Sequence, residues 1–114
     1  MSLTRRHSWR AKAIGISAVL SAVLVPVRAQ SLTGTTSAGL YYDVTGSGEP
    51  VVFIHAFSVD RRMWEPQLAA FASRFKVIRY DLRGHGNSIA PTEPYTGYAD
   101  LRNILDELRV DKAT

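Results

Sequence analysis

Four side chains that can transfer a proton or attack a carbonyl carbon stand near the ends of apolar segments of this sequence. They are His55, Asp81, His85 and Ser88. In α/β sheets the polar end of a buried strand is where ligands and reacting groups collect. A structural role is nevertheless favoured for most of them. His55 is expected to be a core histidine bound to a loop carbonyl, Asp81 a cap of the next turn that pairs with Arg83, and His85 an exposed loop residue.

The segment that must position His55 is the apolar run of residues 51–54. Four consecutive β-branched or aromatic side chains indicate a strand covered on both faces, as in a parallel sheet. Residues 39–44 are aromatic and β-branched as well. We expect an edge strand there, turning antiparallel into the 51–54 strand through the loop 46–50. The strand at 51–54 is therefore predicted to be central and fully buried.

Helical periodicity follows this strand. Residues 67–75 carry an apolar stripe at positions i, i+3, i+4 and i+7, and Pro66 suits the first turn of a helix. Residues 61–64 are expected to form a separate turn capped by Ser58 or Asp60. The stripe predicts a helix that lies on the sheet. It consists of Leu68, Phe71, Ala72 and Phe75.

A second strand and helix complete the pattern. Residues 76–80 alternate and end at Asp81, and the loop 82–88 contains Gly84 and Gly86, as turns with positive φ require. A stripe of leucine and isoleucine then predicts a helix that starts at residue 96 or 97. Strand, helix, strand and helix with short links define the fold class as α/β, with a mostly parallel sheet and flanking helices.

The net charge of +4 comes from the N-terminal residues. Residues 1–29 hold five Lys or Arg and no acid, which leaves nine bases against ten acids in the rest of the chain. No basic face therefore argues for a nucleic acid partner. The absence of cysteine excludes disulfides and thiolate chemistry. Neither metal-ligand spacing nor a GxGxxG sequence after a strand occurs, so no metal and no cofactor is expected.

The first 29 residues have the anatomy of a secretory signal peptide. A basic segment precedes the uncharged apolar stretch 13–25, and Ala29 provides a small residue before a cut at Gln30. The stretch is shorter than the roughly 20 residues that span a bilayer, so a retained anchor is the weaker alternative. The pair Arg5-Arg6 is similar to a twin-arginine signal, but Ser8-Trp9 lies where that signal prefers apolar residues.

These observations predict an exported protein, periplasmic or extracellular, with no stable membrane anchor. Residues 1–29 are the predicted signal peptide. Residues 30–38, rich in Ser, Thr and Gly, are expected to be a flexible lead-in. Residues 39–114 are expected to form a partial domain.

Three pieces of the sequence together resemble the α/β-hydrolase superfamily, over roughly residues 39–114. They are the apolar strand ending in His55-Ala56-Phe57, the helix entry with Trp64, and the segment Tyr80-Asp81-Leu82-Arg83-Gly84-His85-Gly86-Asn87-Ser88. The last is the most specific, because Asp-x-Arg-Gly-x-Gly-x-Ser after a strand is hard to obtain by chance. Residues 63–67 and 77–81 are similar to the branch that includes 3-oxoadipate enol-lactonases and related esterases.

The resemblance implies acyl chemistry by a Ser, an acid and a His, with an oxyanion hole made by two backbone N–H groups. Carried over by position, one of these is the amide of Phe57, and His55 braces the loop that holds it. The Phe57 ring is a candidate pocket wall, as is Trp64, although Trp64 is first expected to fill the gap between helix and sheet. The family usually has Gly where this chain has Ala56, whose methyl group is expected to restrict φ at this turn.

The resemblance implies a structural role for the remaining motif residues. They are Asp81, Arg83, Gly84, Gly86 and Ser88. The nucleophile of the family lies in GxSxG between a strand and a helix. The nearest string here is residues 86–90, but Pro91 and Pro94 disfavour a following helix, so Ser88 is not expected to be the nucleophile. Residues 113–114 look like the approach to the missing strand, so we expect the first part of a longer protein.

The function that the resemblance implies is hydrolysis of a small-molecule carboxylic ester or lactone. Haloperoxidase-like or dehalogenase-like activity is a variant within the enzyme class. The alternative is a catalytically inactive truncated hydrolase, or a binding protein on the same scaffold. The sequence does not predict an oligomeric state.

Overall fold

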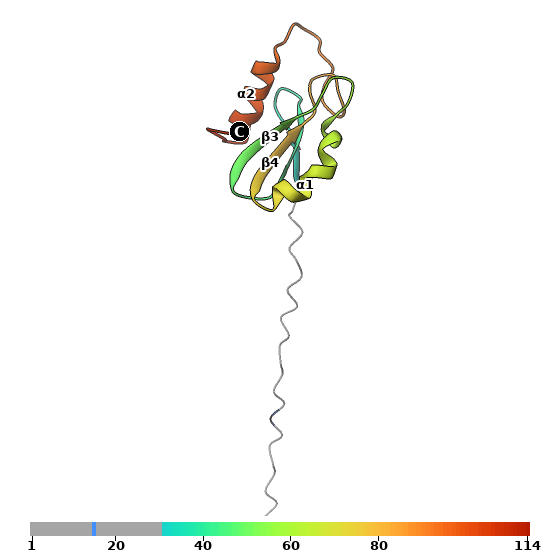
Figure 1. Ribbon diagram of the computed structural model, residues 1–114. Helices are drawn as coiled ribbons and strands as arrows, with labels where there is room; N and C mark the ends of the chain where they lie inside the picture. The colour runs from blue at the N-terminus through green and yellow to red at the C-terminus, as the bar shows by residue number, and fades with distance from the viewer. Residues whose placement is uncertain (1–14, 16–30) are drawn as a thin grey trace, which may run out of the picture.

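Four strands form one sheet in the computed structural model, which describes residue 15 and residues 31–114 (Figure 1). The strands are β1 (Leu32–Thr35), β2 (Tyr41–Thr45), β3 (Glu49–Ile54) and β4 (Phe75–Tyr80), in the spatial order β1-β2-β4-β3. β3 and β4 are parallel, whereas β2 is antiparallel to both β1 and β4. The α/β class is confirmed, with a sheet that is mixed within the described strands. The predicted signal peptide, residues 1–29, lies outside the described residues apart from residue 15.

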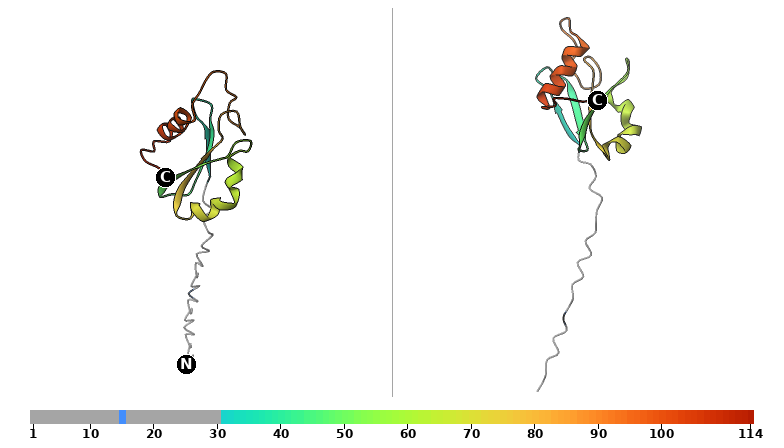
Figure 2. Two further views of the ribbon diagram at one scale, coloured as in Figure 1. Left: turned by 45° about the horizontal axis from the view of Figure 1, so that its top comes forward. Right: turned by 60° about the vertical axis from the view of Figure 1, so that its left-hand side comes forward.

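Helices cover opposite faces of this sheet (Figures 1 and 2). The 3₁₀ helix η1 (Arg61–Trp64) leads directly into α1 (Glu65–Ala72) on one face, and α2 (Gly97–Glu107) lies on the other. The Asp60 carboxylate caps η1, and the Thr96 hydroxyl caps α2 by accepting the N–H of Ala99. Both helix starts confirm the sequence prediction. In residue 15 and residues 31–114, neither helix has the length and apolar character needed to cross a membrane.

The main core lies between the sheet and α2. Its buried side chains are Leu40, Val44, Ile78, Tyr80, Ile104 and Val110. Strand alternation turns Ile78 and Tyr80 toward α2, which contributes Ile104 from its apolar stripe. Burying one such side chain contributes roughly 1.5–3 kcal/mol. This core therefore fixes α2 against the two inner strands, β2 and β4.

An aromatic cluster fills the other face, between β3 and α1. The Phe53 ring lies 5.0 Å from the rings of both Trp64 and Phe71. Trp64 therefore fills the gap between helix and sheet, as predicted. The predicted helical stripe is wrong at its last member, because α1 ends at Ala72 and Phe75 begins β4. A tight turn, in which the N–H of Arg74 bonds to the carbonyl of Phe71, ends the helix before that position.

The predicted antiparallel pairing of the 39–44 strand with the apolar strand is wrong. β2 pairs with β4, with Asp43 opposite Arg79, and β3 lies beyond β4. The connection from β2 to β3 passes close to the start of β4, where a Cβ at Gly46 would collide with the carbonyl oxygens of Ala72 and Phe75. Gly46 also has a φ of 83°, which favours glycine. The glycine-rich connection therefore crosses over a strand instead of making a hairpin.

β3 is half-buried, not fully buried and central as predicted, because β4 pairs with it on one side only. On its other side, the Thr114 N–H donates to the Pro50 carbonyl at 3.1 Å, and the Val52 N–H donates to the Thr114 carbonyl at 2.8 Å. Two slanted bonds of this kind are the pattern of a parallel pair. Thr114 therefore lies where a strand parallel to β3 would start.

β1 lies within the segment predicted to be a flexible lead-in, so that prediction is wrong for Leu32–Thr35. β1 pairs with β2 along its length, from Leu32 opposite Val44 to Thr35 opposite Tyr41. Its three side chains, those of Leu32, Thr33 and Thr35, are all exposed. An exposed edge strand carries little apolar signal, which is why the sequence did not indicate it.

Candidate functional site

The β3 loop, residues 55–60, begins with a histidine that is fixed on both sides. His55 is 3% exposed, its Nε2 accepts the N–H of Leu82 at 2.8 Å, and its Nδ1 lies 2.8 Å from the carbonyl oxygen of Ala56. Because Nε2 accepts a hydrogen bond, the ring proton sits on Nδ1 and is donated to Ala56. The prediction that His55 is a core histidine bound to a loop carbonyl is confirmed. Both ring nitrogens are occupied, so His55 is not free to transfer a proton.

The amide of Phe57 points away from His55. All described peptide bonds are trans, and in a trans peptide the carbonyl of one residue and the N–H of the next point in opposite directions. Because His55 holds the Ala56 carbonyl, the Phe57 N–H is directed to the other side of the loop. No backbone hydrogen bond among residues 31–114 uses this N–H. Within residues 31–114 it is a donor without a backbone partner at the polar end of β3, and its place in an oxyanion hole stays a prediction.

Ala56 fits the loop without backbone strain. Ser58, with a φ of 69°, takes the left-handed conformation, and Ala56 does not. The methyl group at position 56 therefore does not meet the φ restriction expected from the sequence. The Ala56 N–H donates to the Sδ of Met63 at 3.2 Å, so both backbone polar groups of Ala56 are engaged.

Asp81 ties the glycine loop, residues 82–88, to the β3 loop. Its buried carboxylate accepts the N–H of Asn87 at 2.9 Å, and the N–H and the guanidinium of Arg61, both at 2.8 Å. The prediction that Asp81 caps the glycine turn is confirmed, whereas the predicted pairing with Arg83 is wrong. A Cβ at Gly86, where φ is 48°, would collide with the Asp81 carboxylate. The turn therefore requires glycine at this position.

Arg83 and Ser88 anchor the glycine loop to the rest of the fold. Arg83 donates two hydrogen bonds to Asp100 of α2, at 2.7 and 3.0 Å, and these bonds raise the pKa of Arg83. The Ser88 hydroxyl donates to the carbonyl of Asp81 at 2.5 Å and accepts the N–H of Tyr41 at 2.9 Å. Ser88 therefore joins the end of β4 to the start of β2. This contact explains the serine without a nucleophilic role.

His85 lies between the two loops. Its ring centroid is 5.2 Å from that of His55 and 5.5 Å from that of Phe57, and its Nδ1 is 3.0 Å from the Arg83 carbonyl oxygen. His85 is half-buried, not exposed as predicted. The Phe57 side chain is 84% exposed beyond this contact. The turn that carries His85 relies on Gly84, which has a φ of 77°.

A buried ion network that the sequence did not predict lies beneath η1. The Asp43 carboxylate accepts hydrogen bonds from Arg79 at 2.8 and 2.9 Å and from Arg61 at 3.0 Å, and Arg79 also donates to Glu65 at 2.8 Å. Burial works against the charged form of Arg79, but the bonds to Asp43 and Glu65 outweigh it and raise the pKa of Arg79. The sequence shows only that an acid, Asp43, and a base, Arg79, each lie within a predicted strand. Their pairing depends on the register of β2 and β4.

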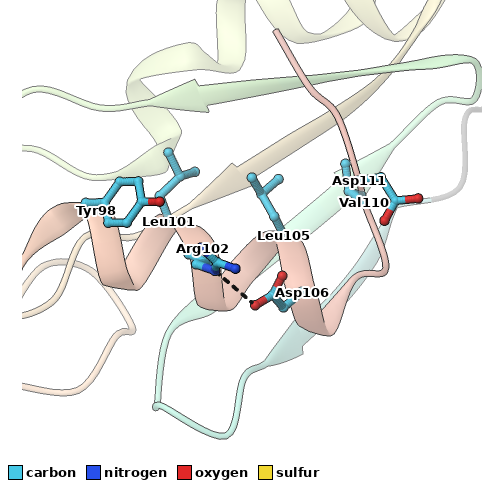
Figure 3. Close-up of a pocket in the computed structure, with 7 residues that line it drawn as sticks. All are labelled: Tyr98, Leu101, Arg102, Leu105, Asp106, Val110 and Asp111. Carbon is cyan, nitrogen blue, oxygen red and sulfur yellow. Dashed lines mark ion pairs between the residues drawn. The ribbon is translucent and has the colours of Figure 1, made fainter.

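A hollow of about 360 Å³ lies elsewhere, on the surface of α2 (Figure 3). It is lined by Tyr98, Leu101, Arg102, Leu105, Asp106, Val110 and Asp111. None of these residues belongs to the β3 loop or the glycine loop, so the hollow and the candidate site are different places. Within residue 15 and residues 31–114, no three His, Cys, Asp or Glu are grouped as metal ligands would be. The chemistry that the two loops offer is hydrogen-bond donation from a fixed backbone amide.

Comparison with known protein families shows which family has this sequence pattern. Residues 51–113 match the family described as "Alpha/beta hydrolase family". The match covers more than half of the chain and includes both loops. This chain belongs to the alpha/beta hydrolase family, which confirms the resemblance noted in its sequence.

Two curated relatives show the range of activities among similar chains. The 3-oxoadipate enol-lactonase 1 of Acinetobacter baylyi is 42% identical over 65 residues, which are 55% of this chain and 24% of that protein. A putative non-heme chloroperoxidase of Synechocystis sp. is 38% identical over 73 residues, or 60% of this chain and 26% of the relative. The chain thus spans about a quarter of the length of these relatives.

Solved structures agree with this grouping. The crystal structure of the enol-lactonase from Burkholderia xenovorans LB400 matches with a TM-score of 0.64 and 33% sequence identity, over 73% of this chain and 35% of that one. The epoxide hydrolase CorEH matches with a TM-score of 0.63 and 30% identity, over 74% of this chain and 31% of the other. The fold is therefore shared by proteins whose names indicate different hydrolytic reactions.

Proposed function

We propose that this chain is part of a hydrolase that cleaves carboxylic ester or lactone bonds of small molecules, and that the Phe57 amide is one donor of its oxyanion hole. The observation that carries the proposal is the free Phe57 N–H, aimed by the hydrogen bond from His55 to Ala56. Negative charge develops on the carbonyl oxygen during acyl transfer, and a backbone donor already in place stabilises it without reorganising. The similarity to two enol-lactonases supports the substrate class.

The nucleophile, the acid and the base of this reaction lie outside these residues in our proposal. No GxSxG sequence occurs in the 114 residues. The Ser88 hydroxyl donates one hydrogen bond, to the carbonyl of Asp81, and accepts another, from the N–H of Tyr41. Thr114 already pairs with the free edge of β3. A strand continuing there would place its polar end beside the β3 loop, because the carboxyl ends of parallel strands meet at one edge of a sheet. A serine at that end would lie near the Phe57 amide.

A backbone substitution in the protein as its gene encodes it tests the proposed donor. Replacing Phe57 by its α-hydroxy acid, phenyllactic acid, changes the N–H to an ester oxygen and keeps the ring. We expect kcat for a p-nitrophenyl ester to fall by about 10²–10³, the loss for one oxyanion-hole donor. The control Phe57→Ala keeps the N–H and should act mainly on KM. An α-hydroxy variant with wild-type kcat would contradict the proposed donor.

The sequence of the gene beyond codon 114 separates this function from an inert product. A GxSxG within about ten residues, followed later by an acid and a His, supports the hydrolase. An early stop codon supports a catalytically inactive protein or a binding protein. Residues 30–114 alone are expected to show no esterase turnover. Hydrolysis of a p-nitrophenyl ester by that purified segment would contradict a nucleophile outside it.

We also propose that the protein is exported and that residues 1–29 are removed. A cut before Gln30 would leave β1 intact, since β1 starts at Leu32 and the Ser31 hydroxyl lies 2.6 Å from the Thr45 hydroxyl. Mass spectrometry of the exported protein should find Gln30 at its N-terminus. A mature protein that begins at Met1 would contradict the proposal.

A further inference from the structure

Met63 contains the one sulfur atom in residues 2–114, because the chain has no cysteine and its other methionine is Met1. The side chain is 41% exposed. It belongs to η1, immediately after the β3 loop, and the Met63 N–H is fixed by the carbonyl of Asp60 at 3.0 Å. A single accessible thioether therefore lies on a rigid turn beside the candidate oxyanion donor.

The sulfur of Met63 binds the second backbone polar group of Ala56. It accepts the Ala56 N–H at 3.2 Å, while the ring of His55 holds the Ala56 carbonyl at 2.8 Å. The two peptide groups that flank Ala56 are thus each fixed by a side chain, one by sulfur and one by imidazole. The second of these peptide groups carries the Phe57 N–H. A rotation of the first would be passed to the second through the backbone of one residue.

We propose that Met63 is a positioning residue for the Phe57 amide and that oxidation of its sulfur is a reversible switch of the β3 loop. The proposal rests on the proposed function, in which that amide stabilises the oxyanion. A thioether is a weak, polarisable acceptor that fits this short turn. A sulfoxide puts an oxygen where the Ala56 N–H now meets sulfur, and it is polar and bulkier. The N–H and the sulfur must then move apart.

The chemistry of the switch is simple. Hydrogen peroxide transfers one oxygen atom to the thioether, so that sulfur is oxidised by two electrons and the peroxide is reduced to water. Methionine sulfoxide reductase returns the sulfoxide to the thioether at the expense of two thiols of the reductase system, which become a disulfide while the oxygen leaves as water. Within residues 30–114, Met63 is the one side chain with sulfur, so mild peroxide treatment of this part of the protein reports on this site.

The first test uses the protein as its gene encodes it, with the amides of alanine and phenylalanine labelled with ¹⁵N. Growth on norleucine replaces the sulfur of Met63 by a methylene group of similar shape. We expect the Ala56 and Phe57 signals to shift and the exchange of the Ala56 amide to speed up by a factor on the order of ten or less, as for the loss of one hydrogen bond. Distant signals such as that of Ala99 should stay in place, which controls for unfolding.

The second test measures p-nitrophenyl ester hydrolysis on the same samples. Peroxide should lower kcat of the methionine protein with little change in KM, the reductase should restore it, and the norleucine protein should not respond. Any longer gene product with further methionines needs these replaced by leucine first. An Ala56 amide unaffected by norleucine, or an affected amide with unchanged kcat, would overturn the proposal. If no form hydrolyses any ester, the proposed function fails, and the amide measurement still decides whether Met63 holds the loop.

Discussion

Replacing Asp43 by asparagine should remove a large part of the stability of this domain. The Asp43 side chain is 5% exposed and accepts three hydrogen bonds from Arg79 and Arg61. Asparagine has the same shape but lacks the charge, and its NH₂ group would face guanidinium donors. Arg79, whose side chain is 6% exposed, would then keep Glu65 as a partner, and the Glu65 side chain is 65% exposed.

The size of the effect follows from burial and from the partners that remain. Removing one member of a buried ion pair costs about 3–5 kcal/mol, because the other charge is left without compensation. Glu65 and Asp81 still compensate part of the charge on Arg79 and Arg61. We therefore expect the lower end of the range, a loss of about 3 kcal/mol. Domains of this kind are stable by about 5–15 kcal/mol, so this loss is a large fraction of the total.

Urea unfolding of residues 30–114 measures the loss, and Trp64, the one tryptophan in that segment, is the fluorescent reporter. The midpoint should fall for Asp43→Asn with an unchanged slope. Asp60→Asn is the matched control. The hydrogen bond from the Arg62 side chain holds the pKa of Asp60 well below its usual range. The Arg62 side chain is 74% exposed, however. Solvent screens this pair, and asparagine still caps η1, so little change is expected.

A double-mutant cycle decides whether the network is the cause. Arg79→Met should be destabilising alone, and the combination with Asp43→Asn should cost less than the two single losses together, because the variants share partners. Additive losses would refute the coupling that the geometry implies. A loss below about 1 kcal/mol for Asp43→Asn, the value of an exposed pair, would refute the reasoning from burial.

Gly86→Ala should destabilise the fold by about 1–3 kcal/mol in the same urea assay, because alanine must adopt a left-handed φ and meet the Asp81 carboxylate; wild-type stability would contradict this. Burial raises the pKa of Tyr80 to about 12, and the charge of Asp100 adds to the shift. Because the unfolded value is about 10, neutral Tyr80 stabilises the fold below that pH. We expect this contribution, about 2–3 kcal/mol, to be lost as the pH rises from about 10 through about 12, and the loss to disappear in Tyr80→Phe on alkaline titration. Ser88→Ala should lower stability by about 1–2 kcal/mol and leave ester hydrolysis by the gene product within a few-fold, whereas abolished turnover would make Ser88 the nucleophile.

Features set by neighbouring residues were predictable from the sequence. Asp60 and Thr96 cap the helices that follow them, as short polar side chains do when they precede helical residues. The role of His55 was also predictable, because a single polar ring at the end of a buried strand must find partners nearby. These predictions needed no knowledge of which strands pair.

Strand order and ion pairing could not be predicted, because both depend on residues far apart in the chain. The alternation of residues 41–45 is compatible with pairing to β3 or to β4. The close approach of Gly46 to Ala72 and Phe75, which settles the choice, appears only when the chain has folded. The sequence favours Arg83 as the partner of Asp81, because that arginine is only two residues away. In the fold Arg83 turns to Asp100 of α2, and the partner of Asp81 is Arg61, twenty residues away.

The two loops of the candidate site hold each other in a reciprocal way. His55 of the β3 loop accepts the N–H of Leu82 in the glycine loop, and Asp81, just before the glycine loop, accepts the N–H of Arg61, just after the β3 loop. Each bond joins a buried side chain of one segment to the backbone of the other, so neither loop can shift without breaking a bond that the other depends on. The geometry at the end of β3 is thereby built from two distant segments of the chain. The position of the Phe57 amide is consequently a property of both loops, and a change at Gly86 should alter the position of residue 57.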